Sequence, residues 1–165
     1  TTPRGSYLDA LSPLTVTLGV QNVSFVAQAV DWIPESLFQI LTAAYRHRGF
    51  SFVRILQRCP EFVGNMFEPW VHDPQRMQML AHDNGIRISP ALQKIYRNQL
   101  AHDPADINRA REIASSEDPL PVGILYRNPE VPCYEDLRGA GKLRTADQVR
   151  GALDGELDKF TVWPQ

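Results

Sequence analysis

Apolar residues in the first third of the chain follow two periods, one typical of buried strands and one typical of a helix. Residues 24–30 begin with Ser24 and are then apolar at both sets of alternating positions except at Gln28, as in a strand buried within a parallel sheet. Residues 34–48 carry one apolar stripe at helical spacing, made of Leu37, Ile40, Leu41, Ala44 and Tyr45. Residues 50–56 form a second apolar run. The pattern predicts two parallel strands joined by a right-handed crossover helix.

Two residues mark the ends of the helix in this unit. Pro34 stands in the first turn, where its missing N–H costs nothing, and Gly49 stands just past the last turn. We expect the core of the unit to contain six apolar side chains, namely Phe25, Leu37, Leu41, Tyr45, Phe52 and Ile55.

Cys59 is the candidate functional residue of this region. It follows the second strand, at the carboxyl end of a parallel sheet, where open α/β sheets bind ligands. Most free cysteines, however, act as small buried hydrophobes. The residue pattern alone therefore leaves both roles open.

Three His-Asp pairs follow residue 71, beginning at His72, His82 and His102. Histidine and carboxylate groups bind metal ions. Asp73 and Asp103, however, each precede a proline and fit a helix N-cap followed by proline in the first turn. Neither H-x₃-H spacing nor a nearby cysteine pair accompanies them, so we interpret the pairs as helix caps rather than as a zinc site.

The remaining patterns after residue 62 predict a mainly helical region with one short strand at 122–126. Residues 62–71 form an aromatic-rich loop that we interpret as packing rather than as a lid. Helical patterns occupy 76–80, 90–100, 105–115 and 146–160, the last behind a Thr145-x-x-Gln148 capping box. Residues 139–142, Gly-Ala-Gly-Lys, lack the flanking glycine and the following Ser/Thr of a phosphate loop, so we interpret them as a plain loop.

Composition narrows the class of protein. The chain has 165 residues, 43% of them hydrophobic, with a net charge of −2 and a pI near 6.0, which favours neither a nucleic-acid nor a membrane partner. Cys59 and Cys133 lie far apart and form no disulfide framework, which indicates a reducing, cytoplasmic setting. The chain opens without Met, so we expect a fragment, and removal of an initiator or leader would look the same.

Several short motifs occur in a distinctive order. They are Thr2-Pro3-x-Gly5, Pro13-Leu14, Leu18-Gly19, Phe25-Val26-Ala27, Ala43-Ala44-Tyr45, His47-x-Gly49-Phe50-Ser51-Phe52-Val53, Ile55-Leu56-Gln57-x-Cys59-Pro60 and, later, Pro121-Val122-Gly123-Ile124-Leu125-Tyr126. In this order they resemble the β subunit of 2-oxoacid:ferredoxin (2-oxoacid:acceptor) oxidoreductases. The resemblance is strongest over residues 1–62.

The resemblance implies an α/β fold: part of a thiamine-diphosphate-binding parallel sheet with flanking helices (residues 1–62), followed by a mainly helical C-terminal extension (residues 63–165). It implies oxidative decarboxylation of a 2-oxoacid, of the 2-oxoglutarate or pyruvate type, to an acyl-CoA with electron transfer to ferredoxin. The implied cofactors are thiamine diphosphate, Mg²⁺ and a [4Fe–4S] cluster. The implied partners are an α subunit, ferredoxin, the 2-oxoacid and coenzyme A, within a hetero-oligomer.

By the same resemblance, Cys59 is the fourth thiolate ligand of the [4Fe–4S] cluster, and the other cofactor ligands are expected before Thr1. The isolated chain should then be inactive. The alternative is a non-catalytic α/β interaction or assembly module that keeps only the sheet.

Overall fold

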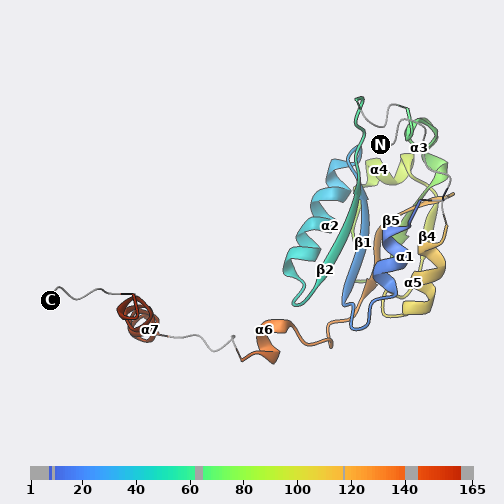
Figure 1. Cartoon of the computed structure of the whole chain (residues 1–165). Helices are drawn as coiled ribbons and strands as arrows, with labels where there is room; N and C mark the ends of the chain where they lie inside the picture. Colours follow the sequence, from blue (N-terminus) through green and yellow to red (C-terminus); the bar gives the residue numbers. More distant parts are fainter. Residues whose placement is uncertain (1–7, 9, 62–64, 117, 140–144, 161–165) are drawn as a thin grey trace. The chain divides into compact units, whose positions relative to one another are not determined.

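The structure is a computed structural model, which describes residues 8, 10–61, 65–116, 118–139 and 145–160. The chain divides into two compact units, Thr1–Pro132 and Cys133–Gln165. The predicted division at residue 62 stays a prediction. The first unit contains the sheet and is shown with its helices in Figure 1.

The first unit is built on a five-stranded sheet in the order β2-β1-β5-β3-β4. The strands are β1 (Phe25–Val30), β2 (Ser51–Leu56), β3 (Met77–Ala81), β4 (Gln99–Ala101) and β5 (Leu120–Arg127). All neighbours pair in parallel except β1 and β5, which are antiparallel. The α/β class is therefore confirmed, with a mostly parallel sheet. Because β1 and β5 run in opposite directions, the carboxyl ends of the strands lie at two opposite ends of the sheet, each called an edge below. The carboxyl ends of β1 and β2 lie at one edge, and those of β3, β4 and β5 lie at the other.

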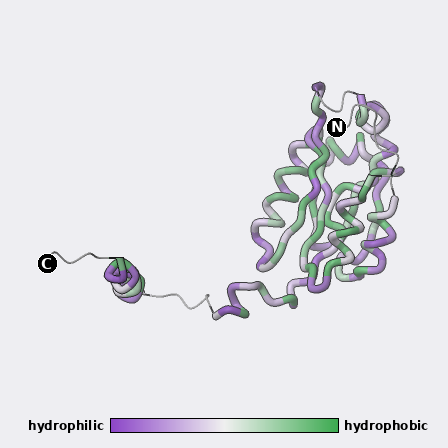
Figure 2. The backbone as a smooth tube through the Cα atoms, in the orientation of Figure 1, coloured by the Kyte–Doolittle hydropathy of each residue, from purple (hydrophilic) through white to green (hydrophobic). Residues whose placement is uncertain are grey.

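Helices cover both faces of the sheet. They are α1 (Pro13–Leu18), α2 (Pro34–Arg46), α3 (Glu68–His72), the 3₁₀ turn η1 (Pro74–Arg76), α4 (Pro90–Ile95) and α5 (Ile107–Ala114). One core cluster joins the sheet to α2 and α4, and a second joins it to α1 and α5. Figure 2 shows the hydrophobic segments converging on the strands between these layers.

The predicted strand–helix–strand unit is confirmed. All six residues of β1 are buried, and β1 pairs in parallel with β2. The polar exception, Gln28, donates from Nε2 to the carbonyl oxygen of Pro121 at 2.6 Å, whereas its Oε1 is buried without a hydrogen-bond partner among the described residues. Pro34 opens α2, and Gly49 has a φ of 130°, a conformation that favours glycine.

The predicted core of this unit is correct for Phe25 and wrong for three residues. Leu41 is 42% exposed, Tyr45 90% and Ile55 44%. The helix turns Ser36 and Ile40 to the sheet, so the apolar stripe read from the sequence is wider than the face that the sheet can cover.

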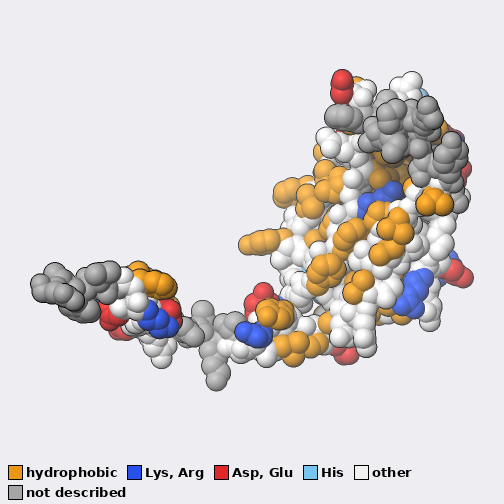
Figure 3. All heavy atoms as spheres, viewed as in Figure 1, with side chains coloured by type: hydrophobic (Ala, Val, Ile, Leu, Met, Phe, Trp, Pro, Cys, Tyr) orange, Lys and Arg blue, Asp and Glu red, His pale blue; other side chains and the backbone are white. Residues whose placement is uncertain are grey.

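These side chains belong to a larger apolar surface. We call the exposed side chains of Phe38, Leu41, Tyr45, Phe50 and Ile55 the α2–β2 apolar surface. Figure 3 shows hydrophobic side chains gathered over the side of the molecule that α2 and β2 form. Within the described part of the chain, β2 pairs with β1 alone, so its outer edge is open.

Two strands were not predicted. Residues 76–80 were expected to be helical, but Pro74 begins only a 3₁₀ turn, and Met77–Ala81 is strand β3. β3 is held between β5 and the short strand β4, with Met77 opposite Leu120. The region after residue 62 therefore supplies three strands, not one.

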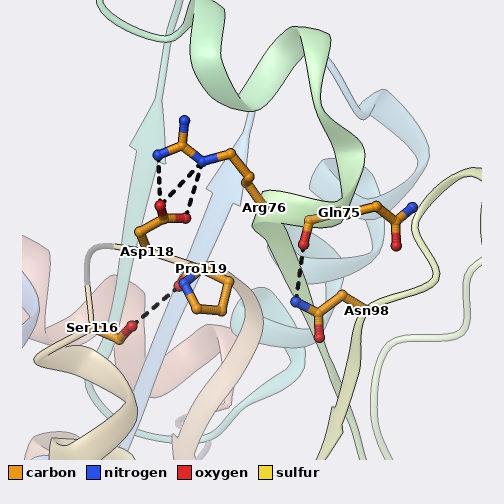
Figure 4. Close-up of polar contacts among 6 residues, drawn as sticks. All are labelled: Gln75, Arg76, Asn98, Ser116, Asp118 and Pro119. Atoms are coloured by element: carbon orange, nitrogen blue, oxygen red, sulfur yellow. Dashed lines mark hydrogen bonds and ion pairs between the residues drawn. The ribbon is translucent and has the colours of Figure 1, made fainter.

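The starts of β3 and β5 are joined by an ion pair, drawn in Figure 4. Arg76, just before β3, donates to Asp118, just before β5, with an Nη2–Oδ2 distance of 2.6 Å. These hydrogen bonds lower the pKa of Asp118 below its ordinary value. Beside them, Asn98 Nδ2 donates to the carbonyl oxygen of Gln75 at 3.1 Å, which ties the start of β4 to η1.

The second unit contains α6 (Tyr134–Leu137) and α7 (Ala146–Asp158). The capping box between Thr145 and Gln148 is present as predicted. Within the described residues, no helix is long and apolar enough to cross a membrane.

Candidate functional site

Cys59 lies in the loop that follows β2, at the edge formed by the carboxyl ends of β1 and β2, and its free thiol is partly buried. The loops after the two strands are clamped together. The Arg58 backbone N–H and its Nε donate to the carboxylate of Asp31, at 3.2 and 3.1 Å. Asp31, which follows β1, in turn donates its backbone N–H to the carbonyl oxygen of Leu56 at 3.0 Å. This clamp fixes the backbone on which Cys59 lies.

A row of aromatic rings continues from the clamp. The Arg58 guanidinium lies 5.7 Å from the centroid of the Trp32 ring. The Phe67 ring lies 5.7 Å from Trp32 and 6.3 Å from Trp70. Arg76 lies 5.6 Å from the centroid of the Trp70 ring. The three rings are tilted with respect to one another, and an arginine lies at each end of the row in a favourable cation–π arrangement.

Phe67 and Trp70 belong to residues 62–71, the segment interpreted as a packing loop, although Trp70 lies in α3. Both side chains pack against the core cluster on the α2 face. That interpretation is therefore confirmed for these two residues. Between this loop and the Cys59 edge lies a small pocket of about 240 Å³, lined by Arg58, Pro60, Asn65, Phe67, Glu68 and Val71.

The described residues near Cys59 do not form a complete cluster site. A [4Fe–4S] cluster takes four thiolates. The second cysteine, Cys133, belongs to the other unit, where its Sγ donates to Asp136 Oδ2 at 2.9 Å. Among the described residues, no set of three or more His, Cys, Asp or Glu side chains gathers as a metal site. This described part of the chain thus offers Cys59 as one ligand and no more.

A larger pocket of about 960 Å³ lies at the opposite edge of the sheet. It is lined by residues that follow the carboxyl ends of β3, β4 and β5. The polar residues of this lining are His82, Asp83, Asn84, His102, Asp103 and Arg127. This edge obeys the rule that ligands bind beyond the carboxyl ends of parallel strands, but it is not the edge predicted from the sequence.

His82 and His102 meet in this pocket. Their ring centroids are 5.7 Å apart and the rings are nearly perpendicular, at 87°. His102 Nε2 is 3.2 Å from the carbonyl oxygen of Leu125. Burial lowers the pKa of both histidines, and His102 adds to this effect for His82. Both rings are therefore neutral at pH 7.

The cap interpretation of the His-Asp pairs is partly right. Asp73 caps η1 by accepting from the Gln75 N–H, but Asp103 accepts from the Ala105 N–H in a turn, and Asp106 is the N-cap of α5. What sequence reasoning missed is the proximity of two of the three histidines. The signal was present as a repeat, because residues 81–83 and 101–103 both read Ala-His-Asp. Most of the Gly-Ala-Gly-Lys segment at 139–142 lies outside the described residues.

Comparisons with known proteins agree with the resemblance. Residues 92–141 match the family model for the C-terminal part of the pyruvate ferredoxin oxidoreductase beta subunit. The 2-oxoacid:ferredoxin oxidoreductase subunit beta of Sulfolobus sp is 25% identical over 139 residues, which are 81% of this chain and 41% of the relative. The 2-oxoacid:ferredoxin oxidoreductase 2 subunit beta of Aeropyrum pernix is 26% identical over 132 residues, 78% of this chain and 38% of the relative.

A third relative matches over a shorter stretch at a higher sequence identity. The 2-oxoglutarate oxidoreductase subunit KorB of Mycobacterium tuberculosis is 39% identical over 67 residues, which are 41% of this chain and 18% of the relative. The matched part of the chain spans at most 41% of the length of these three curated relatives. The chain is therefore similar to β subunits of 2-oxoacid:ferredoxin oxidoreductases, and its residues 92–141 match the C-terminal part of such a subunit.

Proposed function

We propose that the chain works as part of a β subunit that oxidatively decarboxylates a 2-oxoacid of the 2-oxoglutarate or pyruvate type. The products are an acyl-CoA and electrons passed to ferredoxin. The observation that carries the proposal is the match to 2-oxoacid:ferredoxin oxidoreductase β subunits over about four-fifths of the chain. Named relatives and the family model refer to 2-oxoacid, 2-oxoglutarate and pyruvate enzymes.

In this proposal the cofactors are thiamine diphosphate with Mg²⁺ and a [4Fe–4S] cluster. When bound, they supply decarboxylation and one-electron transfer, which protein side chains do not perform alone. Among the described residues, Cys59 is the one proposed cluster ligand, and the remaining ligands belong to other parts of the complex. The task of this chain is then to hold one thiolate at a fixed place.

The Asp31–Arg58 clamp suits that task. It ties the loop carrying Cys59 to the end of β1 through a backbone and a side-chain hydrogen bond. The Arg58 cation lies next to Cys59 in sequence, where it would offset part of the negative charge of a bound cluster. Loss of the clamp should therefore loosen the ligand without removing it.

The proposed partners are an α subunit and ferredoxin, in a hetero-oligomer. The α2–β2 apolar surface and the open edge of β2 support association with another chain or segment.

The test uses the full-length β subunit with its α partner. Cys59→Ser should lower the iron content and abolish ferredoxin reduction, whereas the matched variant Cys133→Ser should retain both. Asp31→Asn should reduce ferredoxin reduction while most of the iron is kept. Full iron and activity in Cys59→Ser would refute the ligand assignment. Loss in Cys133→Ser instead would move the role to the other cysteine.

A second candidate function is a non-catalytic interaction or assembly module. The α2–β2 apolar surface favours it, because five exposed large apolar side chains on a helix and an edge strand are typical of a contact surface. The activity of the complex after Cys59→Ser distinguishes the two functions. A module would still bind the α subunit after Cys59→Ser with unchanged activity of the complex, whereas the catalytic proposal requires activity to fall.

A further inference from the structure

The two Ala-His-Asp segments are placed side by side by the strand register. Ala81 ends β3 and Ala101 ends β4, and these two residues are paired in the parallel ladder. The next residue on each strand is a histidine, and the His102 N–H donates to the carbonyl oxygen of Ala81 at 3.2 Å. The same tripeptide, ending two neighbouring strands in register, therefore brings two imidazoles together. Histidines 20 positions apart in the sequence become neighbours in space, with ring centroids 5.7 Å apart.

The hydrogen bond of His102 fixes which of its two ring nitrogens carries the proton. A carbonyl oxygen only accepts, so His102 Nε2 carries the proton that Leu125 receives, and Nδ1 keeps its lone pair. Among the described residues, His102 Nδ1 and His82 Nε2 are buried and have no hydrogen-bond partner. A metal-binding histidine usually donates its other ring N–H to a carboxylate or a backbone carbonyl. His102 already has that second bond.

Gly85 shapes the space around His82. A Cβ on Gly85 would lie 2.7 Å from His82 Nε2 and 2.8 Å from each of its two neighbouring ring carbons. Nearly equal distances place the glycine over the face of the ring rather than in its plane. The lone pair of Nε2, which lies in the ring plane, is therefore not covered by Gly85.

We propose that His82 and His102 bind one borderline divalent cation of the Zn²⁺ class, through His82 Nε2 and His102 Nδ1. With Zn–N bonds of about 2.0–2.1 Å and a tetrahedral angle, two imidazole centroids sharing one ion lie about 5.2 Å apart. The separation here is 5.7 Å, so a ring movement of about half an ångström, or a wider angle at the metal, is sufficient.

The rest of the coordination is open. No third His, Cys, Asp or Glu side chain completes the set among the described residues. Both histidines line a pocket of about 960 Å³, which has room for water or an oxygen-bearing ligand. A metal with two protein ligands and exchangeable positions binds more weakly than a closed structural site, and it leaves room for a small molecule.

The charges around the pair are mixed. Asp83 and Asp103 act on His82 as negative charges and favour a cation, whereas Arg127 acts on it as a positive charge. Arg109 and Asp103 act on His102 in the same opposed way. Because the two carboxylates and the two guanidinium groups offset each other, the affinity for a cation depends on the imidazole nitrogens.

This inference does not depend on the proposed oxidoreductase function. It concerns the opposite edge of the sheet, and it is tested on the whole 165-residue chain, without a polyhistidine tag. The chain contains four histidines, and His72 is the natural control. It also begins a His-Asp pair, but it pairs with Glu68 on the surface of α3 and has no neighbouring imidazole in the described structure.

The experiment is a ZnCl₂ titration near pH 7.5, followed by the imidazole signals in ¹H–¹⁵N NMR spectra and by calorimetry. Zinc should shift the signals of His82 and His102 together, with one ion bound, and should leave that of His72 unchanged. His82→Gln and His102→Gln should each weaken zinc binding about tenfold or more, as loss of one of two ligands requires, whereas His72→Gln should retain it. Reading the imidazole signals separates this site from zinc bound to thiols.

Gly85→Ala is a second variant that removes no ligand. Its Cβ would push the His82 ring aside, so zinc binding should fall while His102 keeps its hydrogen bond to Leu125. The proposal is overturned if zinc leaves both imidazole signals unchanged, or if His82→Gln binds as tightly as the unmodified chain. It is also overturned if His72→Gln causes the same loss as the other two variants.

Discussion

The two neighbouring residues Ile40 and Leu41 offer a sharp test of how α2 packs. Both are apolar and both lie on the stripe read from the sequence, but Ile40 is fully buried and Leu41 is 42% exposed. Replacing each by Ala removes a similar number of carbon atoms, and Ala is the best helix former, so propensity does not penalise either change. The difference between the two variants therefore reports burial.

The magnitudes follow from that difference. Ile40→Ala deletes atoms inside a closed core and should lower the free energy of unfolding by about 2–5 kcal/mol, because the loss includes a cavity. Leu41→Ala deletes atoms that solvent already touches. Complete burial of a Leu side chain is worth about 1.5–3 kcal/mol, and Leu41 is only partly buried with no closed cavity to leave, so the loss should be about 1 kcal/mol.

Equilibrium unfolding in urea, followed by tryptophan fluorescence, measures both values. Trp32 and Trp70 pack against the same core cluster as Ile40, so their emission reports this unit. The midpoint should move much further for Ile40→Ala, with the same dependence on urea in both variants. Equal losses would show that Leu41 is covered, either within the chain or by self-association. Repeating the measurement at a tenfold lower protein concentration separates those two explanations.

Two further predictions concern the sheet and the buried histidines. Gly123→Ala should destabilise the chain by about 1–3 kcal/mol in the same urea assay, because φ is 137° and a Cβ would lie 2.9 Å from that of Leu80; no loss would mean that β3 does not approach β5 so closely. Stability should become constant about one pH unit above 6.5 and should fall as the pH drops through that value. Burial lowers the folded-state pKa of three histidines below the 6.5 expected when unfolded, so the unfolded chain gains protons first. These histidines are His47, His82 and His102. The fall should continue until the pH reaches the folded-state values, and replacing His82 by Gln should make it shallower.

Local signals in the sequence were sufficient for the elements they directly control. The two-faced apolar run of β1, the proline that opens α2 and the capping box at Thr145 each fix a backbone state within a few residues. β3 could not be found in this way. Asp73-Pro74 is a sound start signal, and it does begin a turn, but pairing with β5 then extends the chain from Met77 onward. Tertiary pairing overrode a local helical pattern.

The two candidate sites differ in the same way, since one depends on local signals and the other on tertiary pairing. Cys59 could be placed from sequence because the strand before it is parallel to a strand only one crossover away. The approach of His82 to His102 depends on the in-register pairing of β3 with β4, and β4 has only three residues. Leu41 illustrates a related limit. Periodicity identifies an apolar stripe, but how much of that stripe is covered depends on the position of the helix against an edge strand.

The antiparallel junction between β1 and β5 predicts that the two candidate sites act independently. Because the chain direction reverses there, the carboxyl ends of β1 and β2 face the opposite way from those of β3, β4 and β5. β5 runs from one edge to the other over residues 120–127, which spans about 23 Å at roughly 3.3 Å per residue. Changes separated by more than about 10 Å, with no shared partners, usually combine additively. Alkylation of Cys59 should therefore leave zinc binding at His82 and His102 unchanged, and saturating zinc at those histidines should not alter the alkylation rate of Cys59. Mass spectrometry of the alkylated peptide, with and without zinc, measures that rate. If zinc slows it and His82→Gln removes the effect, the two edges are coupled through the sheet, and the reasoning from its topology fails.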